Sequence, residues 1–171
     1  MMIKDSLCFD DVLLIPKKSD INSRGEIDLS TNLGSHKFRL PIISSPMDTV
    51  TETQMAISMF AAGGLGIIHR YNTIVKQTSL VREVFDYLEE TNNSNMNKVS
   101  AAIGTSSDFL ERALSLYKAG ARILCIDVAH GHHTLVEKSI KSLKDALAQD
   151  ITIIAGNVAT AEGFKDLSDW G

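Results

Sequence analysis

From Pro41 onward the sequence alternates short apolar runs with longer segments of helical period, and the alternation recurs five times. Short buried strands that alternate with amphipathic helices are typical of βα units, whose strands pair in parallel. The expected strands are residues 41–45, 65–69, 99–103, 123–127 and 151–156. The chain is therefore predicted to be an α/β protein built on a parallel sheet.

The helical segments between these strands carry recognisable start and stop residues. Asp48 or Thr49 is expected to cap the first helix, Gly63-Gly64 to end it, and Thr73 to open the second. The third is expected from Ser107-Asp108 to Ala119-Gly120, the fourth from about Thr134, and the fifth over residues 161–169. On the fourth helix, lysines at 138, 141 and 144 oppose the apolar stripe and are expected to face solvent.

Every expected strand ends in polar or glycine residues, which are Ser44-Ser45, His69-Arg70, Gly104-Thr105, Asp127 and Gly156-Asn157. Functional residues at the carboxyl ends of strands suit both an open doubly wound sheet and a TIM (β/α)8 barrel. An eight-unit barrel takes about 250 residues. In the barrel alternative about five βα units are present in these 171 residues and three would be missing.

Composition limits the partners. Hydrophobic residues make up 44% and charged residues 22% of the chain, and the net charge is −4, so neither nucleic acid nor an anionic membrane is expected. A small-molecule ligand fits better. Cys8 and Cys125 have no framework spacing, which indicates reduced thiols and a cytoplasmic setting. No signal peptide or membrane span is expected.

The segment SSPMDTVTE, residues 44–52, holds the first group of candidate site residues. Ser45 and its neighbour Ser44 place hydroxyls after a buried strand, and Met47 offers a polarizable surface for a flat base. An ordinary strand-to-helix turn, capped by Asp48, is the alternative that the residues alone leave open.

Later strand ends hold the second group. Asp127 could accept hydrogen bonds from ribose hydroxyls or a carboxamide, or simply cap its loop, and the Asn157 amide could donate and accept. His69 and Arg70 form a polar pair at the sheet edge. The histidines around Gly131 suggest zinc, but a third ligand at recognisable spacing is lacking, so His132 and His133 are expected to face solvent and no metal is predicted.

Five blocks, in this order along the chain, resemble those of the IMP dehydrogenase / GMP reductase family. They are FDDVLLIP (9–16), SSPMDTVTE (44–52), GGLGIIH (63–69), IDVAHGH (126–132) and AGNVATAEG (155–163). The resemblance is closer to the dehydrogenases, because reductases usually carry an asparagine just before the methionine. It implies that Ser45 and Met47 bind the purine nucleotide, IMP. It implies that NAD contacts Asp127, Val128, Ala129, His130 and Asn157. It places His69 and Arg70 close to the cofactor, where Arg70 departs from the histidine or lysine that is commoner in the family.

The family mechanism has a cysteine thiolate add to C2 of IMP, a hydride pass to NAD and water hydrolyse the intermediate. Neither Cys8 nor Cys125 lies where that nucleophile is expected, so the catalytic cysteine and the potassium loop are expected beyond Gly171. The chain passes from Glu90 through the polar stretch 91–97 without the regulatory CBS modules. Residues 1–40 are interpreted as an extension before a single partial barrel domain, and the resemblance implies a homotetramer.

Two other functions are compatible with these residues. One is a GMP reductase, which converts GMP to IMP with NADPH. The other is a half-barrel that has lost its chemistry and serves as a binding or assembly module.

Overall fold

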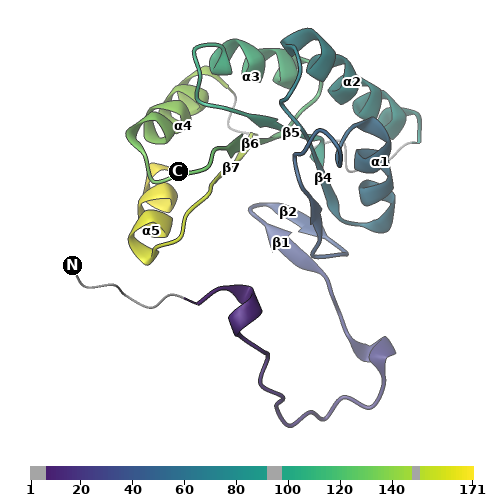
Figure 1. Ribbon diagram of the computed structural model, residues 1–171. Helices are drawn as coiled ribbons and strands as arrows, with labels where there is room; N and C mark the ends of the chain where they lie inside the picture. The colour runs from purple at the N-terminus through teal and green to yellow at the C-terminus, as the bar shows by residue number, and fades with distance from the viewer. Residues whose placement is uncertain (1–6, 92–97, 148–150) are drawn as a thin grey trace, which may run out of the picture.

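A computed structural model describes residues 7–91, 98–147 and 151–171 (Figure 1). A short amino-terminal part contains the 3-10 turns Phe9–Asp11 and Arg24–Glu26 and the strands β1 (Thr31–Leu33) and β2 (His36–Phe38). The strands of the main sheet are β3 (Ile43–Ser44), β4 (Leu65–Ile68), β5 (Ser100–Ile103), β6 (Ile123–Asp127) and β7 (Thr152–Gly156). The helices are α1 (Thr53–Ala62), α2 (Ile74–Glu90), α3 (Phe109–Lys118), α4 (Thr134–Ala146) and α5 (Ala161–Trp170).

The five strands of the main sheet are parallel, as expected from the alternation in the sequence, and they lie in the order β3-β4-β5-β6-β7. A doubly wound sheet reverses its strand order at a switch point, and helices cover both of its faces. Here the order never reverses among the described strands, and α1 to α5 follow one another along one side of the sheet (Figure 1). The architecture is therefore an α/β half-barrel, and the doubly wound alternative is excluded.

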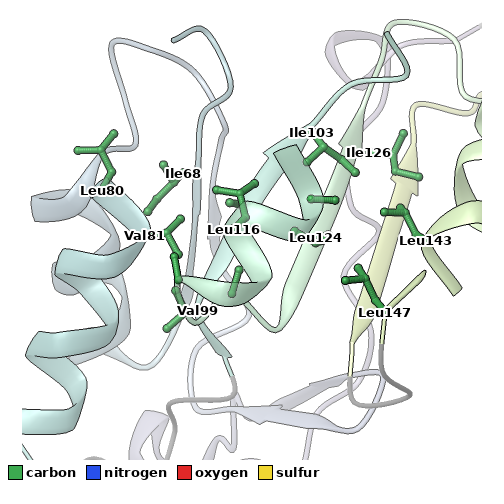
Figure 2. Close-up of a cluster of buried hydrophobic side chains, with 14 of the residues drawn as sticks. Ile68, Leu80, Val81, Val99, Ile103, Leu116, Leu124, Ile126, Leu143 and Leu147 are labelled. Atoms are coloured by element: carbon green, nitrogen blue, oxygen red, sulfur yellow. The ribbon is translucent and has the colours of Figure 1, made fainter. Parts of the chain in front are cut away.

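Helices and sheet enclose the larger hydrophobic core. The helix-facing residues of the central strands, Ile68, Ala101, Ile103, Leu124 and Ile126, are fully buried. Val81, Leu116 and Leu143 of successive helices pack against them (Figure 2). The expected boundaries hold at several ends: the Thr73 hydroxyl accepts a hydrogen bond from the Lys76 amide, and Gly63 ends α1 with a left-handed φ of 94°. The three lysines of α4 are exposed.

The β1–β2 hairpin covers the opposite, inner face of the sheet. Phe38 is buried against strand residues whose side chains alternate with the helix-facing ones, and these are Leu65, Ile67, Ala102 and Ile123. The buried His36 ring lies with Nε2 2.9 Å from the Thr152 hydroxyl, so the hairpin reaches as far as β7. The sequence interpretation placed only an extension here and missed the hairpin, because each of its strands has three residues.

His36 is expected to make the stability of the fold depend on pH. Burial, followed by the positive charge of Lys98, lowers the pKa of His36 below its ordinary 6.5. The folded chain therefore binds the proton less readily than the unfolded chain. The stability that neutral His36 contributes is fully present above about pH 6.5 and is lost as the pH falls through the folded-state pKa. The free energy of unfolding then changes by at most about 1.4 kcal/mol per pH unit.

Urea unfolding of the wild type and His36→Gln at about pH 7.5 and 5.5 tests this expectation. The wild type should lose more stability than the variant on acidification, because glutamine does not titrate. Equal losses would contradict the assignment, since the remaining histidines are the same in both proteins.

The polar stretch 91–97 was expected to be a loop. Thr91 caps the carboxyl end of α2, and residues 92–97 lie outside the described residues. In the part of the chain that the structure describes, no helix is both long enough and apolar enough to cross a membrane.

Candidate functional site

The carboxyl ends of the parallel strands meet at one edge of the sheet, and the predicted site residues lie along this edge. In the strand register, Ile103 pairs with Ile126 and Asp127 pairs with Gly156, so neighbouring strands end almost level. Asp127 follows Ile123 and Cys125 at two-residue spacing on the inner face. Its carboxylate therefore lies at the mouth of the half-barrel, on the side away from the helices.

A folded turn, rather than the first helix, follows β3. The Met47 carbonyl accepts hydrogen bonds from the amides of Val50 and Thr51, both at 3.0 Å, and the buried Thr51 hydroxyl donates to the Ser45 carbonyl at 2.7 Å. The prediction that Asp48 or Thr49 caps the helix is wrong. This turn satisfies the local amides, and α1 begins only at Thr53 after Glu52.

The turn leaves both predicted nucleotide contacts accessible. Ser45 is exposed, and 51% of the Met47 surface is exposed. Thr51 also lies 2.9 Å from the Ser44 hydroxyl, which fixes the base of the turn on β3. The structure thus presents Ser45 and Met47 on a supported loop beside the strand edge.

His69 lies beneath this loop and is buried. Its Nε2 donates to the Glu52 carboxylate at 3.2 Å, and its Nδ1 accepts from the Tyr71 amide at 3.1 Å. These partners assign the proton to Nε2. His69 therefore joins the β3–α1 segment to the end of β4, and Glu52, which sequence reasoning did not single out, is its partner.

Arg70 crosses the sheet edge. Its Nη2 donates to the Asp127 carbonyl at 3.2 Å, and its guanidinium lies 5.3 Å from the centre of the Tyr71 ring. A Cβ placed on Gly104 would lie 3.2 Å from Nη1, so this side chain passes over β5 on its way to β6. The Nε atom is buried and has no hydrogen-bond partner in the described residues. Arg70 thus brings a positive charge to the end of β6.

The loops after β6 and β7 are joined by their backbones. The backbone N–H of Asn157 and its side-chain Nδ2 both donate to the Val128 carbonyl at 3.0 Å. The backbone N–H of Gly131 donates to the backbone carbonyl of Asn157 at 2.6 Å. A Cβ on Gly131 would lie 2.8 Å from the Gly156 carbonyl carbon, so only glycine fits there. One side-chain donor of Asn157 is thereby occupied.

The four residues predicted to contact a cofactor in the β6–α4 loop differ in exposure. Ala129 and His130 are exposed, and Asp127 is half-buried. The Val128 side chain packs against the helix-side core, while its carbonyl accepts the two bonds from Asn157. The loop therefore offers Asp127, Ala129 and His130 to a ligand.

The expectation that His132 and His133 simply face solvent is wrong for His132. Its Nε2 donates to the Asp166 carboxylate at 2.8 Å, and 30% of its side chain is exposed. His133 is exposed, but its Nδ1 accepts from the Leu135 amide and caps α4. Among residues 7–91, 98–147 and 151–171, no three His, Cys, Asp or Glu side chains are grouped to hold a metal ion.

The two cysteines lie apart from the strand edge. Cys125 is largely covered on the inner face of β6, where burial, and then the charge of Asp127, raises the pKa of its thiol to about 12. Cys8 lies in the exposed segment before the hairpin. A thiolate nucleophile at the mouth is therefore supplied by neither residue.

A parallel half-barrel sheet with its polar strand ends on one edge is typical of α/β barrel proteins that bind small molecules there. The chain belongs to the IMP dehydrogenase / GMP reductase family, because the model of that domain matches residues 6–171. These family names describe oxidoreductases that act on purine nucleotides. The resemblance inferred from the five sequence blocks is thus confirmed.

Curated relatives of both names are similar to the chain. The inosine-5'-monophosphate dehydrogenase of Borreliella burgdorferi is 34% identical over 98% of this chain and 52% of its own length. The inosine-5'-monophosphate dehydrogenase of Nitrosopumilus maritimus is 30% identical over 98% of this chain and 60% of its own length. The GMP reductase of Bacillus subtilis is 32% identical over 95% of this chain and 48% of its own length. The chain spans about half the length of these relatives.

Proposed function

We propose that this chain forms the amino-terminal half of the catalytic barrel of an IMP dehydrogenase, which oxidises IMP to XMP with NAD in guanine nucleotide synthesis. The observation that carries the proposal is the position of the SSPMDTVTE loop. The Thr51 hydroxyl holds this loop against the end of β3, at the same edge of the sheet as Asp127. A purine nucleotide on this loop and a dinucleotide on the β6 side would share one mouth.

In this proposal Ser45 and Met47 contact the purine nucleotide. The exposed thioether of Met47 provides the apolar surface for the base, and the Ser45 hydroxyl provides a hydrogen-bonding group. Both residues stand on a turn that is held by its own hydrogen bonds, so little ordering would accompany binding.

Asp127, Val128, Ala129, His130, Asn157, His69 and Arg70 are assigned to the cofactor side. The residues present suit a nicotinamide riboside, because the half-buried Asp127 carboxylate has no hydrogen-bond partner in the described part of the chain. A carboxylate in that state accepts from hydroxyl or amide donors. NAD, when bound, would receive the hydride that leaves the purine. His69 and Arg70 would act by holding Glu52 and the end of β6.

The remaining features of the family enzyme are proposed to come from outside these 171 residues. They are the last barrel units, the loop with the catalytic cysteine and the potassium-binding loop. A homotetramer in the cytoplasm is part of the same proposal. The similarity to the Nitrosopumilus relative extends over 284 positions, more than the length of this chain, which supports the proposed absence of an inserted CBS module.

A GMP reductase that uses NADPH is the second candidate. The GMP reductase of Bacillus subtilis supports this candidate, because its alignment with the chain covers 165 residues and is therefore no longer than the chain itself. The residue just before Met47 favours the dehydrogenase, because it is Pro46 where reductases usually carry an asparagine. Assays of the enzyme with its complete barrel would separate the candidates: IMP with NAD should yield NADH for the first, and GMP with NADPH should consume NADPH for the second. Turnover of neither pair would favour a binding or assembly module.

Asp127→Ala in that complete enzyme is expected to weaken NAD binding by about 10- to 100-fold and IMP binding by less than about twofold. The reason is the loss of charge-assisted hydrogen bonds to the cofactor alone. Calorimetric titration with each ligand measures both values. Asp86→Ala is the matched control, because Asp86 is an exposed carboxylate paired with Arg82 on α2. Equal losses for the two ligands would contradict the role of Asp127.

A further inference from the structure

The β6–α4 loop is attached to the β7–α5 segment at two separate points. One is the backbone junction, where Val128 and Gly131 bond to Asn157. The other is a side-chain pair, His132 and Asp166, whose Nε2 and Oδ2 atoms lie 2.8 Å apart. Ala129 and His130, which are proposed to meet the cofactor, lie between the two ends of the first junction, and His132 follows that junction directly, so both points affect how the stretch is ordered.

The surface of α5 is shaped around the His132 ring. The ring centre lies 6.0 Å from that of Trp170, in a tilted arrangement. Gly163 is buried, and a Cβ placed on it would lie 3.2 Å from the Cβ of His132. A larger residue at 163 would push the histidine away from Asp166. The pair is thus a packed contact between two elements rather than a meeting of two mobile surface groups.

The rest of the loop is anchored less firmly. Ala129 and His130 are exposed, and His133 is used to cap α4. His132 is therefore the side chain that ties the end of the loop nearest α4 to a neighbouring helix, and α5 supplies the acceptor. Without this tie the loop would be held by the Asn157 junction and, at its start, by Arg70, which donates to the Asp127 carbonyl.

We infer that His132, held by Asp166, is a positioning residue that keeps the Asp127–His130 stretch in its binding conformation before the dinucleotide arrives. The inference rests on the proposed function of that stretch as the cofactor loop. Ordering a loop in advance lowers the entropic cost of binding the ligand that touches it. The pair should consequently affect the dinucleotide and leave the purine nucleotide, on the β3–α1 loop, almost unaffected.

The test uses the enzyme with its complete barrel and the ligands NAD and IMP. His132→Ala should weaken NAD binding by about fivefold, the ratio that corresponds to the loss of one hydrogen bond of about 1 kcal/mol, with IMP affinity unchanged. Amide hydrogen exchange of residues 129–132 should become faster. Glu137→Gln is the matched control, because Glu137 forms a comparable pair with Lys141 on the outer face of α4 and should change neither measurement.

Variants at the partner separate positioning from a general loss of structure. Asp166→Ala should reproduce the fivefold loss, and the double variant with His132→Ala should be no weaker than either single variant. Asp166→Asn keeps an acceptor for Nε2 and should restore most of the affinity. Additive losses, equal losses for IMP and NAD, or faster exchange without any change in NAD affinity would overturn the inference.

The wild-type titrations distinguish the two levels of the proposal. Wild-type enzyme that binds neither ligand would remove the proposed function and this inference with it. Wild-type enzyme that binds both ligands, with a His132→Ala variant that binds NAD equally well, would remove the inference alone.

Discussion

Gln77→Leu is expected to lower the free energy of unfolding by about 3 kcal/mol. Gln77 is fully buried on α2, and its Nε2 donates to the Ala102 carbonyl at 2.7 Å and to the Ile68 carbonyl at 3.4 Å. Its Oε1 accepts from Arg112 Nη1 at 2.8 Å. Leucine fills a similar volume, but it leaves an arginine that is only 11% exposed without one of its acceptors.

The loss should be large because Arg112 belongs to a wider network. Arg112 also donates to the Asn72 carbonyl and to the Asp108 carboxylate. The Ser106 hydroxyl, then Arg112, lowers the pKa of Asp108, because both donate hydrogen bonds to its carboxylate. Partly satisfied buried networks cost more than apolar replacements of the whole set.

Urea unfolding of the chain at low concentration measures the effect. Ser79→Ala is the control on the same helix, because the Ser79 hydroxyl donates to Glu83 at an exposed position, and it should change stability by less than about 0.5 kcal/mol. A Gln77→Leu protein as stable as the control would show that the network contributes no net stability.

The regular part of the fold could be predicted because its signals are local. Apolar runs and helical periods set the five strands and five helices, and capping residues such as Thr73 and Gly63 act within one turn of their position. Parallel pairing then forces the strand ends onto one edge. For this reason the sequence sufficed to place Asp127 and Ser45 at the same mouth.

The features that were missed depend on contacts between distant residues. The hairpin is stable because Phe38 and His36 reach strands far along the chain, and three-residue strands carry no period. The His132–Asp166 pair joins the β6–α4 loop to helix α5, and a histidine in a loop gives no sign of an acceptor 34 residues away. The start of α1 was misplaced because Met47 and Thr51 bond within the turn, which is an alternative to helical pairing that capping rules do not weigh.

The 171-residue chain assayed alone is expected to form no NADH from IMP and NAD. Covalent catalysis on the purine requires a thiolate at the mouth of the barrel. Burial raises the pKa of Cys125 to about 12, and this thiol lies on the inner face below Asp127. Cys8 lies in the exposed segment before the hairpin. The proposed binding loops alone are not expected to activate the purine nucleotide.

The same chain is expected to associate in solution rather than remain a monomer. Among the described strands, β3 and β7 lie at the two edges of the sheet, and each pairs with a neighbour on one side only. Unprotected edge strands can pair with other chains. Leu13, Leu14 and Ile15 are 94%, 97% and 85% exposed, and Ile43 on β3 is 48% exposed. Apolar surface of this kind seeks cover.

Two measurements on the purified chain check both expectations: absorbance of NADH over time, and mass by light scattering after size exclusion. A curated relative named inosine-5'-monophosphate dehydrogenase, such as that of Borreliella burgdorferi, serves as the active control under the same conditions. NADH formation at an ordinary enzymatic rate by a monomer would show that these 171 residues hold a nucleophile that the positions of Cys8 and Cys125 do not reveal. Association without turnover is the expected result, because β3 and β7 each lack a pairing strand on one side among the described residues.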